Sequence, residues 1–269
     1  SKRAFLNGRI DLAQAESIIE VINAKTEKGL DVAVNQLKGN LSSEIEKIKN
    51  EAMSILAHLE AAIDFPEDEI EDFNSDKLDE RINFIIENIN DLLKTTKEGK
   101  IYKEGIKTVI VGKPNVGKSS LLNTLIDEKR AIVTDIPGTT RDIIEEVINL
   151  EGLPLKIIDT AGIRKTEDMV EKIGVEKAHN SLKSSDLVIM MLDVSQGLTE
   201  EDLNIYNSIK NKPLIVAVNK TDLPQKLNRE EINNKFSDHP LLWISVKERE
   251  GLKELKKAII DEVFEEEIS

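Results

Sequence analysis

Cysteine is absent from this 269-residue sequence. A chain without thiols forms no disulfide, carries no thiol nucleophile and offers no thiolate ligand to zinc. The absence fits a reducing compartment, because disulfides persist mainly in oxidising ones. Any chemistry of this chain must therefore come from other residue types.

Long apolar stretches are also lacking. No uninterrupted apolar run approaches the roughly 18 residues that a membrane span requires. The first residues, SKRAF, include neither an initiator methionine nor a signal-peptide core. We therefore expect a piece of a longer cytoplasmic protein that makes no membrane contact.

Positive charge is in short supply, with 37 Lys and Arg residues against 51 Asp and Glu and a net charge of −14. Affinity for a phosphate backbone comes mainly from clustered Lys and Arg, so this balance disfavours a simple electrostatic nucleic-acid binder. Contact with RNA would require a local basic patch or a partner subunit. The hydrophobic content of 39% nevertheless supports a packed core rather than disorder.

Residues 1–100 show the periodicity of helices. Apolar residues recur at helical spacing in three stretches, which are Leu12, Ala15, Ile18, Ile19 and Ile22; Ile45, Ile48, Ala52, Ile55, Leu56 and Leu59; and Ile82, Ile85, Ile86, Ile89, Leu92 and Leu93. This part should be an all-helical domain. Between two of its helices, residues 60–80 hold ten acidic residues and one lysine. One interpretation is a solvated acidic loop pinned by Phe65 and Phe73, and the other is a metal-binding cluster, although no ligand spacing supports it.

After Gly99 and Gly105 the pattern changes to short β-rich runs. The runs are residues 108–111, 143–150, 155–158, 187–192, 214–218 and 241–246. Helical patterns separate most of them, which predicts a mainly parallel sheet with helices on both faces. Only residues 151–152 separate the second run from the third, so these two should form an antiparallel hairpin. The expected fold class is α/β: a Ras-like P-loop NTPase G domain over residues 105–265, preceded by a partial all-α helical domain over residues 1–100.

A phosphate-binding loop is predicted at residues 112–119, GKPNVGKS, which match the P-loop pattern at every fixed position. The loop follows an expected strand and precedes a helical run, as the motif requires. Its glycines allow backbone N–H groups and the helix N-terminus to face a diphosphate. Lys118 can then reach the β and γ phosphates, and Ser119 can offer its hydroxyl to Mg²⁺.

Two further motifs suit magnesium and the γ phosphate. Residues 134–140, TDIPGTT, lie before the second strand, where a switch loop supplies a threonine to magnesium, and Thr140 is the expected ligand. Asp159 begins the sequence DTAG, in which an aspartate contacts magnesium through water and a glycine N–H senses the γ phosphate. Each motif is weak alone and gains weight from its order after the P-loop.

A guanine site is predicted where the run 214–218 ends in Asn219, Lys220 and Asp222. Asp222 can accept hydrogen bonds from the ring N–H and the exocyclic amine of guanine. Adenine would leave the Asp222 carboxylate unpaired. Residues 245–247 loosely resemble the backbone motif that closes over the guanine O6. The residues expected to contact GTP are Asn115, Val116, Gly117, Lys118, Ser119, Ser120, Thr134, Asp135, Ile136, Pro137, Gly138, Thr139, Thr140, Asp159, Thr160, Ala161, Gly162, Asn219, Lys220, Asp222, Ser245, Val246 and Lys247.

One expected catalytic residue is missing. Many small GTPases follow the DxxG motif with a glutamine that orients the attacking water, whereas this chain has Ile163. The polar group must come from elsewhere, and the candidates downstream are Arg164, Glu167, Asp168 and Glu171.

These motifs resemble the MnmE (TrmE) family of tRNA-modification GTPases over the whole length of the chain. Residues 3–9 and 11–16, RAFLNGR and DLAQAE, look like the helical-domain opening of the family, and residues 63–67, IDFPE, look like its acidic segment. Residues 134–142 and 159–164 match its switch regions. The helical matches matter most, because the G motifs are common to other bacterial GTPases.

The resemblance implies a mechanism in which two G domains pair across their nucleotides, with a potassium ion where other systems insert an arginine finger. It places the potassium ligands at Asn115, through its side-chain oxygen, and at Thr134, Ile136 and Thr139, mainly through backbone carbonyls. It also places the catalytic glutamate at Glu171, which would position the attacking water. The alternative is a finger in cis, supplied by Arg164 or Arg141.

The resemblance further implies a partner and cofactors. Family members act with the flavin-dependent protein MnmG to install an aminomethyl-type group at C5 of the wobble uridine of tRNA, with a one-carbon unit from a tetrahydrofolate. The folate-binding domain would precede Ser1, the FAD belongs to MnmG, and a Cys-containing motif and the rest of the helical domain would follow Ser269. We therefore expect this chain to hydrolyse GTP but not to modify tRNA unaided.

Two other interpretations stay open from the sequence. A ribosome-assembly GTPase of the Der type shares the PNVGKS and IPGTTRD patterns, but such proteins carry two G domains. A nucleotide-gated scaffold would use GTP binding to change partner contacts, with incidental hydrolysis. The scaffold predicts little turnover, whereas the GTPase interpretation predicts turnover that rises with potassium.

Overall fold

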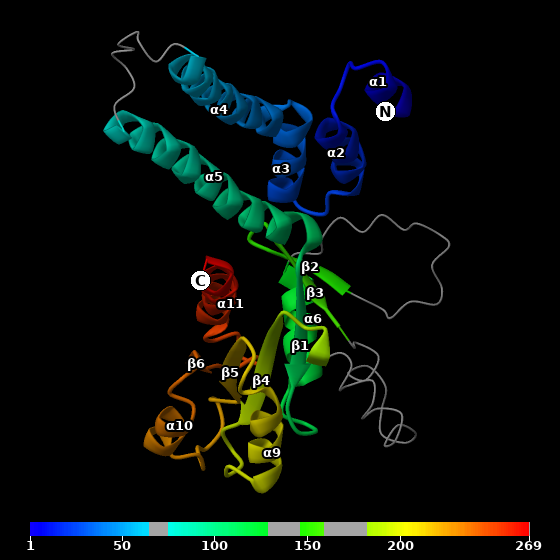
Figure 1. The fold of residues 1–269 in the computed structure, drawn as a ribbon. Helices are drawn as coiled ribbons and strands as arrows, with labels where there is room; N and C mark the ends of the chain where they lie inside the picture. Colours follow the sequence, from blue (N-terminus) through cyan, green and yellow to red (C-terminus); the bar gives the residue numbers. More distant parts are fainter. Residues whose placement is uncertain (65–74, 129–145, 159–181, 269) are drawn as a thin grey trace. The chain divides into compact units, whose positions relative to one another are not determined.

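The computed structural model describes residues 1–64, 75–128, 146–158 and 182–268. The chain divides into two compact units, Ser1–Lys103 and Glu104–Ser269 (Figure 1). In the described ranges, the first unit contains helices and no strand, and the second combines helices with a sheet. No helix within these ranges is both long and apolar enough to cross a membrane.

Five helices account for most of the described first unit. They are α1 (Lys2–Leu6), α2 (Leu12–Asn23), α3 (Glu27–Leu37), α4 (Asn40–Asp64) and α5 (Ser75–Glu104). The start of α2 is a capping box, in which the Asp11 carboxylate accepts from the Gln14 N–H at 2.7 Å and the Gln14 side chain accepts from the Asp11 N–H at 3.0 Å. Such caps satisfy backbone N–H groups that have no partner within the helix. The helical character expected of this part is confirmed.

Side-chain amides join α2 to α3. Gln14 donates to the carbonyl oxygen of Leu37 at 3.1 Å, and Gln36 donates to a carbonyl oxygen of α2 at 3.2 Å. From α5, the Lys103 ammonium lies 2.7 Å from the Glu20 carboxylate. These contacts fix α2, α3 and the end of α5 to one another through groups that are distant in the sequence.

The apolar stripe expected in α2 is only partly buried. Leu12, Ile19 and Ile22 are 67%, 58% and 74% exposed, whereas Ala33 of α3 and Ile55 of α4 are buried. Helical spacing therefore predicted the helix correctly but not which residues are covered. Burial depends on the neighbours that a helix meets, and the periodicity of one segment does not contain them.

The acidic segment is described only at its ends, in the last turns of α4 and the first turns of α5. Residues 65–74, with Phe65 and Phe73, lie outside the described ranges. Neither the solvated-loop nor the metal-cluster interpretation of this segment is therefore tested. Elsewhere in the described part of the chain, no group of three or more His, Asp or Glu residues is arranged to hold a metal ion.

A six-stranded sheet forms the centre of the second unit, in the order β2-β3-β1-β4-β5-β6 (Figure 1). Its strands are β1 (Ile106–Val111), β2 (Glu146–Leu150), β3 (Leu153–Ile157), β4 (Leu187–Asp193), β5 (Leu214–Asn219) and β6 (Leu241–Trp243), and its helices include α6 (Lys118–Glu128), α9 (Glu200–Ile209), α10 (Arg229–Lys235) and α11 (Leu252–Ile268). All pairings are parallel except that of β2 with β3. The predicted, mainly parallel sheet with one hairpin is confirmed.

The turn between β2 and β3 has the backbone conformation of a tight hairpin. Glu151 and Gly152 both have positive φ, at 53° and 99°, which is the backbone of the two-residue turn that matches the twist of antiparallel strands. The Asn149 side chain accepts from the Gly152 N–H at 2.8 Å and holds the turn.

Apolar side chains cover both faces of the sheet. On one face, Met190 and Val216 form a cluster with Tyr206 of α9 and with Phe236, which ends α10. Side chains alternate along a strand, and the intervening Ile189 is also fully buried, so the opposite face is covered as well. Helices α6 and α11 carry further buried apolar residues outside that cluster. The sheet core thereby fixes the carboxyl ends of β1, β4 and β5.

The last strand is shorter than expected. The sequence predicts a strand through Val246, but β6 ends at Trp243, and Ser245 pairs with Glu250 in an isolated antiparallel bridge. The chain leaves the sheet here: the Ser245 hydroxyl contacts Asp222, just beyond β5, and the Val246 N–H contacts the side chain of Asn219, the last residue of β5. With the glycine-rich loop between β1 and α6, this unit has the P-loop NTPase G-domain fold.

Candidate nucleotide site

The loop between β1 and α6 is shaped by residues with positive φ. Gly112, Asn115 and Gly117 have φ values of 142°, 63° and 107°. A Cβ added at Gly112 would lie 2.5 Å from the carbonyl oxygen of Met191, so the loop packs directly on the backbone of β4. The glycines of the pattern are thus required by close approach as well as by backbone conformation.

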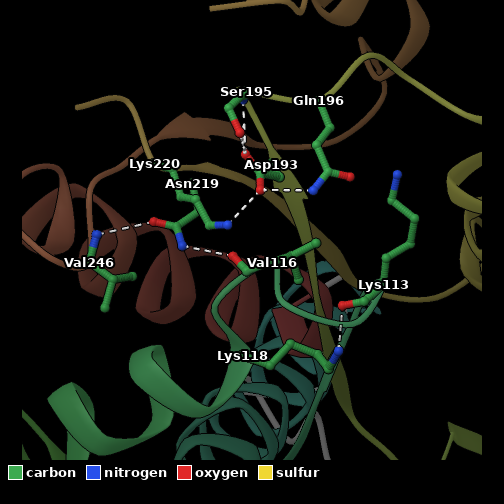
Figure 2. Close-up of polar contacts among 9 residues, drawn as sticks. All are labelled: Lys113, Val116, Lys118, Asp193, Ser195, Gln196, Asn219, Lys220 and Val246. Atoms are coloured by element: carbon green, nitrogen blue, oxygen red, sulfur yellow. Dashed lines mark hydrogen bonds and ion pairs between the residues drawn. The ribbon is translucent and has the colours of Figure 1, made fainter. Parts of the chain in front are cut away.

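Lys118, the first residue of α6, turns its side chain back over this loop. Its ammonium donates to the carbonyl oxygens of Gly112 and Lys113, both at 2.7 Å, and Figure 2 shows the contact with Lys113. Burial lowers the pKa of Lys118, and the nearby Glu201 carboxylate opposes that effect. The arrangement puts a single positive charge at the mouth of a loop of backbone N–H groups, which suits a phosphate.

Asn219, at the end of β5, connects three segments. Its side-chain N–H donates to the carbonyl oxygen of Val116 at 2.8 Å, and its side-chain oxygen accepts from the Val246 N–H at 3.1 Å (Figure 2). Asn219 itself is only 3% exposed. The phosphate-loop motif and the expected guanine motif therefore meet at one buried amide.

Asp222 lies beside the second part of the guanine motif. The Ser245 hydroxyl donates to Asp222 Oδ1 at 2.7 Å and accepts from the Glu248 N–H at 3.2 Å. The Lys247 ammonium is 3.8 Å from Asp222 Oδ2. The tertiary structure thus places residues 245–247, which loosely match the guanine motif, beside Asp222. The hydroxyl of Ser245 orients the Asp222 carboxylate.

Asp193 is a candidate site residue that no sequence motif predicted. It ends β4 beside Asn219, and its carboxylate receives the Lys220 ammonium at 2.6 Å and the N–H and hydroxyl of Ser195 at 2.9 and 2.6 Å (Figure 2). Burial raises the pKa of Asp193, but the hydrogen bonds from Lys220 and Ser195 outweigh burial and hold that pKa below its ordinary value. A polar residue at the carboxyl end of a buried parallel strand was the available signal.

The structure describes only some of the expected magnesium and potassium ligands. Asn115, Ser119 and Ser120 lie in the loop or at the start of α6 and are exposed. The remaining expected ligands and contacts, Thr134, Asp135, Ile136, Pro137, Gly138, Thr139, Thr140, Asp159, Thr160, Ala161 and Gly162, lie outside the described residues, as do Arg141, Ile163, Arg164, Glu167, Asp168 and Glu171. The described site therefore comprises the phosphate loop and the guanine motif.

We expect Gly117→Ala to destabilise the second unit by about 1–3 kcal/mol, because the residue has a positive φ and lies against a buried side chain. The added Cβ would lie 2.3 Å from the Asn219 amide nitrogen, so Asn219 would have to leave Val116. Thermal unfolding measures the effect. Gly197→Ala is the matched control, because no atom lies within 4 Å of its added Cβ, and equal melting temperatures for the two variants would contradict the prediction.

Solved structures with similarity to this chain include one of Era and one of the G domain of FeoB. Era from Aquifex aeolicus bound to GDP.AlF4- has a TM-score of 0.46 and 36% sequence identity, over 58% of this chain and 56% of that chain. The G domain of the T. maritima FeoB iron transporter has a TM-score of 0.44 and 28% identity, over 58% of this chain and 98% of that chain.

Curated relatives match almost the whole chain. The protein named tRNA modification GTPase MnmE from Alkaliphilus oremlandii is 54% identical over 264 residues, which is 98% of this chain and 57% of the relative. That of Clostridioides difficile is 53% identical over 98% of this chain and 58% of the relative. The chain thus spans little more than half the length of these relatives. The family model described as MnmE helical domain matches residues 12–269, and the chain therefore belongs to the MnmE helical domain family.

Proposed function

We propose that this chain binds and hydrolyses GTP. The observation that carries the proposal is the buried Asn219 amide, which holds Val116 of the phosphate loop at 2.8 Å and Val246 of the guanine motif at 3.1 Å. One side chain thereby fixes the spacing between the place for the phosphates and the place for the base. Such preorganisation favours a ligand that spans both, which is a guanine nucleotide.

Discrimination between nucleotides falls to Asp222. Its Oδ1 is held by the Ser245 hydroxyl, so the carboxylate keeps one orientation toward the ring N–H and exocyclic amine of guanine. Adenine has an acceptor and no exocyclic amine at the corresponding positions, and would leave the carboxylate unpaired. Lys220 is held by Asp193 at 2.6 Å, which fixes the lysine stem beside the base site.

The residues present fit a magnesium ion, since the Ser119 hydroxyl at the start of α6 is a hard oxygen donor of the kind that Mg²⁺ prefers. Bound Mg²⁺ would neutralise charge on the β and γ phosphates. Lys118 would bind those phosphates, Thr140 and Asp159 would complete the magnesium site, and Glu171 would position the attacking water. Asn115, with Thr134, Ile136 and Thr139, would hold potassium when two G domains pair.

We also propose that the chain serves tRNA modification as part of a longer protein. The support is the family membership and the two relatives named tRNA modification GTPase MnmE. In this proposal the partners are a second copy of the G domain, MnmG and tRNA, and the product is a C5-modified wobble uridine. The folate and FAD would be bound outside this chain, so GTP hydrolysis is the part of the activity that it can carry alone.

The test of the proposed function is GTP hydrolysis at high protein concentration with magnesium, in potassium chloride and in sodium chloride at equal ionic strength. We expect turnover that is about tenfold or more faster in potassium, because a cation at Asn115 would offset transition-state charge, as an arginine finger does. Nucleotide-dependent binding without turnover in either salt would contradict hydrolysis and favour the scaffold. Equal turnover in both salts would contradict the potassium site alone.

A further inference from the structure

Lys113 is the second residue of the phosphate loop, at a position that the P-loop pattern leaves variable. Its side chain leaves the loop on the side away from Lys118, as Figure 2 shows. The residue is nevertheless only 8% exposed. A buried lysine requires a partner, because an ionised ammonium is costly to remove from water.

The partner of Lys113 is the first turn of α9. The Lys113 ammonium lies 2.8 Å from Asp202 Oδ2 and donates to the Thr199 hydroxyl at 3.1 Å. The Asp202 side chain is 3% exposed, so this is a buried ion pair. Its geometry is fixed from the other side too, because Asp202 Oδ2 also accepts from the N–H and hydroxyl of Thr199, at 3.0 and 2.7 Å, in the capping box of α9.

The backbone of the same residue supports the phosphate-contacting lysine. The carbonyl oxygen of Lys113 accepts from the Lys118 ammonium at 2.7 Å. Lys113 therefore connects the start of α9 to the group that the proposed function assigns to the phosphates. The loop is held at two points, at Val116 by Asn219 and at Lys113 by Asp202.

We propose that Lys113 is a positioning residue of the nucleotide site: its ion pair with Asp202 fixes the backbone that holds Lys118 and so sets the affinity for the β phosphate. The proposal rests on the proposed guanine-nucleotide site. The base contacts at Asp222 do not pass through Lys113, so the ion pair should affect the phosphate-dependent part of binding and leave the base-dependent part alone. A role in folding alone would weaken the binding of all guanine nucleotides together.

The experiment measures dissociation constants of GDP and GMP by competition with a fluorescent GDP, together with thermal unfolding. Lys113→Met removes the charge and keeps most of the stem. We expect its GDP affinity to fall about tenfold while its GMP affinity changes little, since about one charge-assisted contact is lost at the β phosphate. Lys113→Arg, which can still pair with Asp202, should restore GDP binding.

The double variant Lys113→Met/Asp202→Asn separates positioning from stability. It leaves no unpaired buried charge and keeps an acceptor for the capping box, so we expect most of the melting temperature to return while GDP binding stays weak. Recovery of GDP binding together with stability would overturn the proposal, as would an equal loss of GDP and GMP binding in Lys113→Met.

A control and the wild type complete the design. Lys103→Met breaks the Lys103–Glu20 ion pair of the first unit, at 2.7 Å, and should leave the ratio of GDP to GMP affinity unchanged. A change in that ratio equal to that of Lys113→Met would also overturn the proposal. Failure of the wild-type protein to bind GDP would contradict the proposed function itself. If the wild type binds GDP and the double variant binds it with the same affinity, only the role of Lys113 is contradicted.

Discussion

Asp222→Asn is expected to weaken GTP binding by about 100- to 1000-fold and to create a preference for xanthosine triphosphate. The carboxylate can accept both N–H groups on the guanine edge, whereas an asparagine amide would direct its N–H₂ group or its single oxygen at them. Leaving a buried donor unpaired costs about 2–4 kcal/mol when the lost hydrogen bonds involve a charged group. Xanthine carries a carbonyl oxygen in place of the exocyclic amine, so the asparagine N–H₂ can donate to it.

The structure makes this substitution a sharp test. Asp222 Oδ1 is held at 2.7 Å by the Ser245 hydroxyl, and an asparagine oxygen can accept the same bond, so the side chain should keep its place. Competition with a fluorescent nucleotide gives both affinities. Asp261→Asn, an exposed position in α11, is the matched control for loss of one charge. Unchanged GTP preference in Asp222→Asn would show that the base does not bind at Asp222.

Glu171→Ala is expected to lower GTP turnover by about 100-fold or more while GTP affinity stays close to that of the wild type. A positioned acid–base group typically contributes 10²–10⁴-fold. The prediction rests on sequence, because Glu171 lies outside the described residues. The side chain of Ile163 has no polar atom to hydrogen-bond to water, so a different side chain has to orient the nucleophile, and the family resemblance places it at Glu171.

The neighbouring carboxylates provide the controls for Glu171. Glu167→Ala and Asp168→Ala remove the same charge within four residues and should retain near-normal turnover. Single-turnover hydrolysis in potassium chloride, with GTP affinity measured separately, distinguishes lost chemistry from lost binding. Hydrolysis of GTP by Glu171→Ala at the wild-type rate would contradict this role for Glu171 and leave a finger in cis, from Arg164 or Arg141, as the alternative mechanism.

Residue types predicted structure well where a feature depends on adjacent residues. The P-loop spacing predicted the loop between β1 and α6, because the chemistry of a phosphate cradle dictates glycines at fixed positions, and Gly112 and Gly117 do have positive φ. The Glu151-Gly152 pair likewise predicted the hairpin. Both features depend on local backbone conformation, which a few neighbouring residues can specify.

Sequence patterns predicted less where burial or strand length depends on distant neighbours. The β-rich run extended the last strand to Val246, although Ser245 and Val246 instead contact Asp222 and Asn219. Helical spacing at Leu12 and Ile22 predicted a helix there but not its burial, and both residues are largely exposed. In each case the sequence pattern reflected the preferred secondary structure of the segment. Strand length and burial depended on the residues that the segment contacts in the fold.

By itself, the sequence determined the order of the motifs, the division into a helical part and a part with strands, and the type of nucleotide that the residues suit, because residue type and spacing express these features directly. Only the tertiary structure decided which side chains hold the motifs together. The Asn219 amide meets Val116 across 103 residues of sequence, and the Lys113 ammonium meets Thr199 across 86. Contacts over such separations arise from the packing of strands and helices around a common core, and no local pattern encodes them.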